Sequence, residues 1–314
     1  YAFMKMLLGA LGYDAEVEQY TGANWSINVA KRALNIGLDD DLVGEFNGVK
    51  AVNREEACLY ALNTLTADMV EYDAKTTVST NGTTVVIAGS KAKEMVNNGN
   101  TDGKVFDKDG VMQFAEKYFD NLSVKTGSDD FARPANVWKL KAEEIGTYTN
   151  SADATYTAEV KASTIYKDLG LGSNIAAKDV SVYEDGESQT ASAIVKGDDD
   201  TKFGANGVLT EVFYDDDADT VTITKVNTYI GSINKTVKAT DKKDAYVVVT
   251  AEGPVPVQGF DNEFETDDKF ADDDYVLYTY SLTAKEIKSV EAAKKVEGTV
   301  TVAENSKITT IRRL

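Results

Sequence analysis

The sequence contains no histidine, one cysteine and three prolines in 314 residues. Without histidine, serine–histidine and cysteine–histidine nucleophile pairs are excluded, and so are zinc sites with histidine ligands. Cys58 has no second cysteine with which to form a disulfide, so the fold depends on packing rather than on covalent cross-links. We expect Cys58 to be a small core residue of a helix rather than a reactive thiol.

Positive charge is also scarce, because 33 Lys and Arg residues stand against 52 Asp and Glu residues, a net charge of −19. Nucleic acids and anionic membranes bind clustered Lys and Arg, so this balance argues against both partners. No apolar run approaches the roughly 20 residues of a membrane-spanning helix. The sequence also holds no phosphate loop, no dinucleotide fingerprint and no Gly-x-Ser-x-Gly elbow.

Residues 24–38 have the pattern of a helix and its exit. We expect the side chain of Asn24 to cap the helix. The predicted apolar stripe consists of Ile27, Ala30 and Leu34, spaced as on one face of a helix, with Ala33 beside them. Gly37 follows the last periodic residues and fits the left-handed position after a helix end.

A second helix begins at residue 53. Asn53 and Glu56 have the spacing of a capping box, in which each side chain accepts a backbone N–H of the other residue. An apolar helix over residues 2–11 precedes both helices, and Leu11 and Leu65 stand 54 positions apart, as in a tandem helical repeat. Because the chain starts within this helical pattern, we expect it to be part of a longer protein. The predicted buried face of the second helix consists of Ala57, Cys58, Ala61, Leu62 and Leu65.

The order of these elements resembles the S-layer homology repeat of bacterial cell-surface proteins. The residues that carry the resemblance are Trp25, Gly37-Leu38, Phe46 and Asn53-Arg54-Glu55-Glu56. The Phe-x-Asp that usually precedes the tryptophan is replaced by Gln19-Tyr20-Thr21-Gly22. The resemblance implies that residues 1–73 are the end of one repeat and one complete copy.

Repeats of this family attach proteins non-covalently to a secondary cell-wall polysaccharide. The resemblance implies a secreted, non-catalytic protein in the cell wall or surface layer of a Gram-positive bacterium, with the polysaccharide as partner and self-association within the layer. Arg54 would hold an acidic sugar through its planar guanidinium, and Trp25 would stack on a sugar ring. Asn53 and Glu55 are assigned to the same site. The alternative is that Trp25 packs in the core and Arg54 pairs with a neighbouring glutamate.

After residue 73 the sequence becomes rich in Thr, Val, Tyr, Gly and Asp. Asn81-Gly82 joins two strand-like runs over residues 77–87, the strongest short hairpin pattern, and residues 207–229 form a second hairpin. Residues 112–118 fit either a helix or a strand, and residues 163–169 fit a short helix. Short strands with Gly and Asp turns are typical of antiparallel sandwiches or barrels.

We therefore predict an α+β multidomain chain. Residues 1–73 form the helical repeat, and residues 74–314 form an all-β sandwich or barrel-like region, as one module or as two modules divided near residue 150. Residues 131–138 mix aromatic, basic and proline side chains, which favours a packing corner over a glycan platform.

The acidic clusters are the metal candidates. Calcium prefers several carboxylate oxygens, which makes Asp215, Asp217 and Asp219 the calcium candidates of the chain. No EF-hand spacing occurs, and aspartate in turns commonly serves turn geometry and solubility, so we favour a solvated interpretation and expect no cofactor. The other clusters are Asp39–Asp41, Asp198–Asp200, Asp267-Asp268 and Asp272–Asp274.

Two other functions stay open from the sequence alone. The first is a glycan-active enzyme anchored by the same repeat, which requires a groove with two carboxylates, and no spacing singles out such a pair. The second is an adhesin-like binding module.

Overall fold

The computed structural model describes residues 1–73, 76–80, 83–87, 91–171, 179–189, 201–253, 259–267, 269–294, 299–304 and 307–312. The chain forms two compact units. Unit 1 comprises residues 1–128 and 135–151, and unit 2 comprises residues 129–134 and 152–314. Helices and mostly antiparallel sheets make up the described residues, which agrees with a mixed α and β class. Within these residues, no helix has the length and apolar character needed to cross a membrane.

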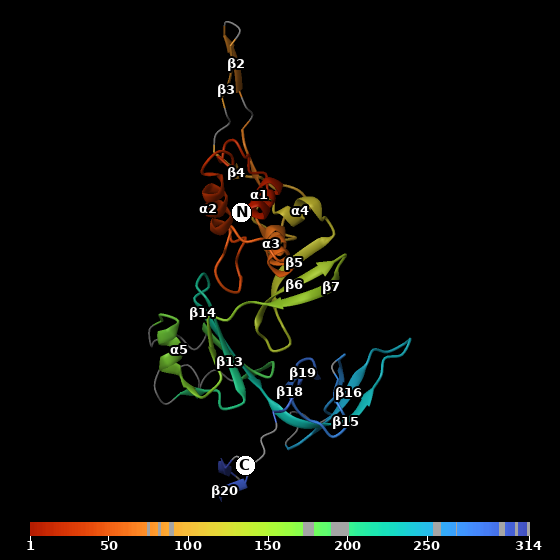
Figure 1. Cartoon of the computed structure of the whole chain (residues 1–314). Coiled ribbons are helices and arrows are strands. Elements are labelled where there is room, and N and C mark those ends of the chain that lie inside the picture. Colours follow the sequence, from red (N-terminus) through yellow and green to blue (C-terminus); the bar gives the residue numbers. More distant parts are fainter. Residues whose placement is uncertain are drawn as a thin grey trace. The chain divides into compact units, whose positions relative to one another are not determined.

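Three helices form the beginning of unit 1 and gather around the N-terminus in Figure 1. They are α1 (Ala2–Ala10), α2 (Trp25–Asn35) and α3 (Arg54–Thr66). All three contribute to one core, whose buried members are Met4, Leu8, Leu11, Tyr13, Tyr20, Val29, Ala33, Leu38, Tyr60, Met69 and Val70.

The buried face of α2 differs from the predicted one. Val29 and Ala33 are fully buried, whereas Ile27 is 65% exposed and Leu34 is also exposed. The prediction is therefore wrong for Ile27 and Leu34 and confirmed for Ala33. Both stripes have helical spacing, and the position of α2 against α1 decides which of them is covered.

The two predicted N-caps also differ. Asn53 has an extended backbone, its side chain accepts from the Glu56 N–H at 2.8 Å, and the Glu56 carboxylate accepts from the Asn53 N–H at 2.9 Å, so the capping box is confirmed. Asn24 has φ −101° and ψ 10°, and its side chain makes no capping bond, so that prediction is wrong. An N-cap side chain reaches the first-turn N–H groups from an extended backbone, which Asn24 lacks.

Helix α3 has contacts on two sides. Tyr60 and Thr64 are buried, and Tyr60 belongs to the three-helix core. Leu62 and Leu65 pack on a second cluster, formed by Val105, Ala115, Val124 and Trp138. Because its contacts are divided between two clusters, α3 has no single buried face. The prediction that Cys58 and Ala61 are buried is wrong, since both are exposed.

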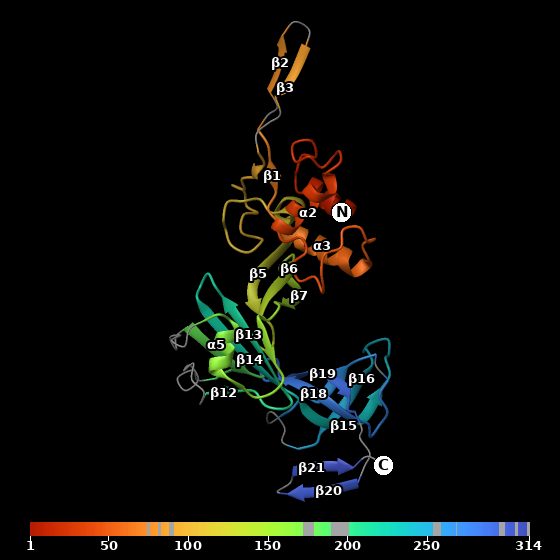
Figure 2. The same cartoon turned by 60° about the vertical axis from the view of Figure 1, so that its left-hand side comes forward.

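The rest of unit 1 consists of short strands and one short helix. Strand β1 (Val70–Glu71) pairs with β4 (Lys93–Glu94), and β2 (Thr76–Thr80) pairs with β3 (Thr83–Ile87). The register sets Thr80 opposite Thr83, which confirms the hairpin, and the predicted Asn81-Gly82 turn lies outside the described residues. Residues 114–118 are helical (α4, Phe114–Tyr118). Figure 2 shows the three-stranded sheet β5 (Leu122–Ser128), β6 (Pro134–Leu140) and β7 (Glu143–Thr149).

Unit 2 contains two five-stranded sheets. The first has the order β11-β10-β14-β13-β8, and its one parallel pair is β10 with β14. Strands β13 and β14 form the second predicted hairpin, with Asp215 opposite Thr220. The predicted short helix is confirmed as α5. The bounds are β8 (Ala154–Tyr156), β9 (Val160–Lys161), α5 (Ala162–Asp168), β10 (Val180–Glu184), β11 (Glu187–Gln189), β12 (Lys202–Phe203), β13 (Val208–Asp215) and β14 (Thr220–Asn227).

The second sheet has the order β17-β16-β15-β18-β19, entirely antiparallel. Its outermost strands β17 and β19 also contact each other, so the sheet is nearly closed into a barrel-like shape. The bounds are β15 (Tyr229–Val237), β16 (Tyr246–Ala251), β17 (Glu263–Glu265), β18 (Tyr275–Ser281), β19 (Glu286–Ala292), β20 (Thr299–Glu304) and β21 (Lys307–Arg312), the last two forming a separate hairpin.

A buried aspartate joins elements of both sheets of unit 2. Asp185 is 1% exposed, and its carboxylate accepts from the Asn227 N–H at 2.8 Å and from the Tyr229 hydroxyl at 2.6 Å. The next residue, Gly186, has φ +92°, and an added Cβ there would lie 2.4 Å from the Asp130 carbonyl oxygen. Only glycine fits both this backbone conformation and this space, so the backbone at Gly186 can pass close to the backbone at Asp130.

The segment 131–138 is divided between the two units, with residues 131–134 in unit 2 and residues 135–138 in unit 1. Phe131 and Trp138 are buried. The Arg133 guanidinium lies 2.6 Å from Asp129 and 3.1 Å from Glu211. Burial opposes the charge of Arg133, but these two carboxylates hold its pKa above the ordinary value.

Candidate functional site

The residues predicted to hold a glycan lie at two places in unit 1. Arg54 is the first residue of α3 and is exposed, as is Glu55. Neither side chain makes a hydrogen bond or ion pair within the part of the chain that the structure describes. Glu56, which was an alternative partner for Arg54, instead pairs with Lys50 at 3.0 Å. The guanidinium of Arg54 is therefore free to contact a ligand.

Asn53 has a structural role, because its side-chain oxygen Oδ1 accepts the Glu56 N–H in the capping box. The Asn53 and Lys50 hydrogen bonds hold the pKa of Glu56 below its ordinary value. The capping box thereby fixes the start of α3, from which Arg54 projects.

Trp25 lies at the start of α2, half-buried beside α1. Its ring centroid is 6.3 Å from that of Tyr1 in an edge-on arrangement, and the Lys5 Nζ atom lies 5.5 Å from the Trp25 ring centroid. Lys5 also donates to the Tyr20 carbonyl at 2.6 Å, which fixes its ammonium group near the ring. Trp25 therefore packs on the core and still offers part of its ring to the outside.

Trp25 and Lys5 line a cavity of about 540 Å³, which we call the Trp25 cavity. An aromatic ring beside an ammonium group suits a ligand with both an apolar face and a negative charge. Lys5 was not predicted, although it is the only charged residue of α1, which was a usable sign. Arg54 does not line this cavity. The other lining residues are Ala2, Met6, Gly9, Tyr20 and Thr21.

A second cavity of about 460 Å³ lies between α2 and residues 17–19 and includes Lys31 and Arg32. Arg32 pairs with Glu18 at 3.2 Å, and Glu18 also accepts from the Tyr72 hydroxyl at 2.8 Å. Burial opposes the charge of Arg32, but the Glu18 hydrogen bond raises its pKa. Glu18 neutralises Arg32, and Lys31 is the other cation that lines this cavity.

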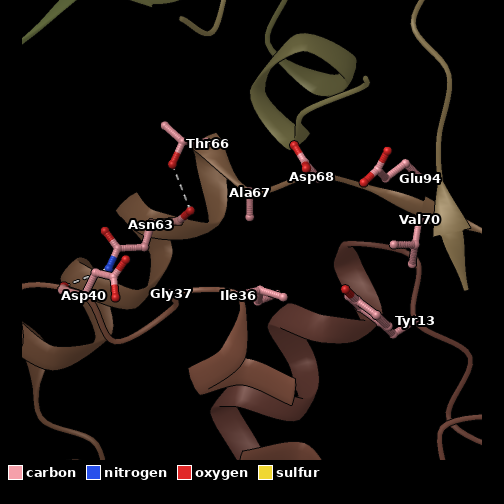
Figure 3. A pocket seen from close by; sticks show the side chains of 10 residues that line it. All are labelled: Tyr13, Ile36, Gly37, Asp40, Asn63, Thr66, Ala67, Asp68, Val70 and Glu94. Carbon is pink, nitrogen blue, oxygen red and sulfur yellow. Dashed lines mark hydrogen bonds between the residues drawn. The ribbon is translucent and has the colours of Figure 1, made fainter. Parts of the chain in front are cut away.

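A third cavity, of about 420 Å³, lies between the end of α2, the end of α3 and β1. Figure 3 shows its ten lining residues, which include the carboxylates of Asp40, Asp68 and Glu94 and no basic side chain. Sequence reasoning missed this site, because its residues come from four separate segments and share no spacing.

The calcium candidates lie in the turn between β13 and β14. The Asp215 carboxylate accepts from the Ala218 N–H at 2.8 Å, and Asp219 accepts from the Tyr214 hydroxyl at 3.1 Å, which raises the Tyr214 pKa. Asp219 has φ +53°, and Asp217 is exposed. Two of the three carboxylates thus stabilise their own turn. Across the described ranges, no group of three or more acidic or cysteine side chains is arranged to hold a metal ion.

Comparison with protein-family models, curated proteins and solved structures finds no match to this chain. The likeness to S-layer homology repeats therefore remains one of sequence pattern, carried by Trp25, Gly37, Phe46 and the residues that open α3.

Proposed function

We propose that unit 1, through an S-layer homology repeat, attaches this chain to an acidic cell-wall polysaccharide. In this proposal the chain is a secreted, non-catalytic surface protein in the wall of a Gram-positive bacterium. The observation that carries the proposal is the Trp25 cavity, where an aromatic ring and the Lys5 ammonium group lie together.

Because the protein is strongly acidic, its attachment to an acidic polymer depends on local Lys and Arg side chains. A chain with a net charge of −19 repels an acidic polymer at long range, so attachment needs short-range contacts that outweigh this repulsion. Lys5 and Arg54 are two such cations in unit 1. Sugar rings stack on aromatic faces through their C–H groups, and Trp25 provides that face.

Unit 2 is the scaffold in this proposal. Its two sheets have closed apolar cores, centred on residues such as Ile223 and Ile233. Its acidic turns are bonded within themselves, as Asp215 and Asp219 show. Self-association in a surface layer would then involve the exterior of unit 2.

The test is co-sedimentation of the full chain with purified cell-wall sacculi. We expect Lys5→Ala and Arg54→Ala each to weaken binding by about tenfold or more, since hydrogen bonds to charged groups are worth about 1.5–3 kcal/mol. Lys139→Ala is the matched control, because it removes an exposed lysine from β6 of the same unit. Its affinity should stay within about twofold of that of the unchanged chain, on the same scale.

Folding is checked by tryptophan fluorescence, because Trp25 and Trp138 both belong to unit 1 and are the two tryptophans of the chain. Full sedimentation of both the Lys5 and the Arg54 variants would overturn the proposal. An equal loss in Lys139→Ala would overturn it as well, because binding would then reflect overall charge.

A further inference from the structure

The third cavity of unit 1, which we call the acidic cavity, has features that the proposed function does not use. Its lining comprises Tyr13, Ile36, Gly37, Asp40, Asn63, Thr66, Ala67, Asp68, Val70 and Glu94. Three carboxylates face a space of about 420 Å³ without a lysine or arginine among the lining residues. Such a site attracts a positive charge and repels an acidic glycan.

Tyr13 gives an independent indication of a ligand. Its side chain is only 8% exposed, and Figure 3 shows the hydroxyl directed toward Ile36 and the middle of the cavity. Within the described ranges of the chain, the Tyr13 hydroxyl has no hydrogen-bond partner. The Arg32 guanidinium lies 5.2 Å from the centroid of the Tyr13 ring, whereas the hydroxyl opens on the cavity, where a polar group of a ligand can form a hydrogen bond with it.

Two of the carboxylates are held in place by the fold. The Asn63 side chain donates to the Asp40 carbonyl at 2.9 Å and so fixes the loop that carries Asp40. At Gly37 an added Cβ would lie 2.3 Å from the Asp40 carboxylate, so glycine leaves the room that this carboxylate occupies. Gln113 donates to the Asp68 carboxylate at 3.0 Å.

The carboxylates do not converge on one point. Figure 3 shows Asp40 with Asn63 at one end of the cavity, and Asp68 with Glu94 at the other. In agreement with this separation, no group of three acidic side chains among the described residues is arranged to hold a metal ion. Ile36 and Ala67 lie between the two ends and supply an apolar middle.

We propose that the acidic cavity binds a linear aliphatic diammonium ligand. One ammonium group pairs with Asp40, and the other pairs with Asp68 and Glu94. The methylene chain covers Ile36 and Ala67, and the Tyr13 hydroxyl accepts a hydrogen bond from an ammonium N–H. This site is separate from the glycan site of the proposed function, and its test involves no glycan.

The test is isothermal titration calorimetry of the full chain with 1,5-diaminopentane at neutral pH and low salt, where charge interactions are least screened. We expect one saturable site per chain. Asp40→Asn and Asp68→Asn should each weaken binding by about tenfold or more, and Tyr13→Phe by about threefold. n-Pentylamine, which has one charge and the same chain length, should bind about tenfold more weakly or worse.

Asp107→Asn is the matched control, because it removes one exposed carboxylate from the same unit outside the cavity. Its affinity should remain within about twofold of that of the unchanged chain. Equal losses in the Asp107 and Asp68 variants would overturn the proposal, since binding would then be diffuse. It would also be overturned if Asp40→Asn had no effect, or if n-pentylamine bound as tightly as the diamine.

Discussion

The two units place their acidic side chains differently. In unit 1, Asp40, Asp68 and Glu94 surround a cavity that no basic side chain lines. In unit 2, Asp185 and Asp219 accept hydrogen bonds from residues of their own sheets and turns. Carboxylates of these residues therefore line a cavity in unit 1, whereas those of Asp185 and Asp219 hold strands and a turn together in unit 2.

This difference follows from the kind of packing in each unit. The cavities of unit 1 lie where helices meet loops, and side chains of both line them. Strands of unit 2 run side by side, so a turn aspartate finds backbone N–H groups within reach. The comparison teaches that acidity alone does not locate a binding site, because local packing decides which carboxylates stay free.

The largest effect should come from the core of unit 2. Ile223 is fully buried in the first sheet, and Ile223→Ala should lower the free energy of unfolding of unit 2 by about 2–5 kcal/mol. Far-UV circular dichroism during denaturant unfolding measures this change. Tryptophan fluorescence, which reports on unit 1, should show an unchanged midpoint. A shift of both signals together would contradict the division of the chain into two units.

The next prediction compares the loss of stability at a hydrogen-bonded, buried aspartate with that at an exposed one. Asp185→Asn should destabilise unit 2 by about 1.5–3 kcal/mol, because Asn227 and Tyr229 lose a charged acceptor in a buried place. Asp217→Asn, in an exposed turn, should change stability by about 0.5 kcal/mol or less. The same circular dichroism transition measures both variants. Equal destabilisation by the two variants would show that the hydrogen bonds of Asp185 do not contribute to the stability of unit 2.

A smaller effect compares two asparagines at helix starts in unit 1. Asn53→Ala removes the capping box of α3 and should cost about 1 kcal/mol of unfolding free energy. Asn24→Ala removes no capping bond, so its cost should be about a few tenths of a kcal/mol. Denaturant unfolding followed by tryptophan fluorescence distinguishes them. A larger loss for Asn24→Ala would mean that Asn24 has a role outside capping.

The smallest effect concerns acid stability. The pKa of Glu56 is lowered in the folded protein by its bonds to Asn53 and Lys50. A lowered folded pKa adds stability that is present above the unfolded pKa of about 4.5 and is lost as pH falls through the folded pKa. The loss of unit 1 stability between neutral and acidic pH should therefore be smaller in Glu56→Gln. An unchanged pH dependence in that variant would contradict the assignment.

Much of the local structure could be predicted. The capping box of Asn53 and Glu56, the left-handed Gly37 at φ +71°, and the hairpin over β2 and β3 are all present. Each depends on residues only a few positions apart, whose backbone preferences act wherever the segment lies. Asn24 is the exception, because its backbone is near-helical and its side chain cannot reach a first-turn N–H.

Burial could not be predicted in the same way. Ile27 and Leu34 have the spacing of a helix face and are exposed, whereas Val29, which was not predicted, is buried with Ala33. Cys58 is exposed, because α3 divides its contacts between the three-helix core and the cluster around Trp138. Several faces of one helix can satisfy the same period, and only the neighbouring elements select among them.

The sequence by itself determined the capping box of Asn53 and Glu56 and the two predicted hairpins, and it excluded histidine chemistry and disulfides. The tertiary structure alone decided that Lys5 lies beside Trp25, that Tyr13 opens on a cavity with Asp40 and Asp68, and that Asp185 is buried. Local backbone preferences act over a few residues of chain, whereas cavities and buried contacts form between segments whose separation in sequence carries no pattern.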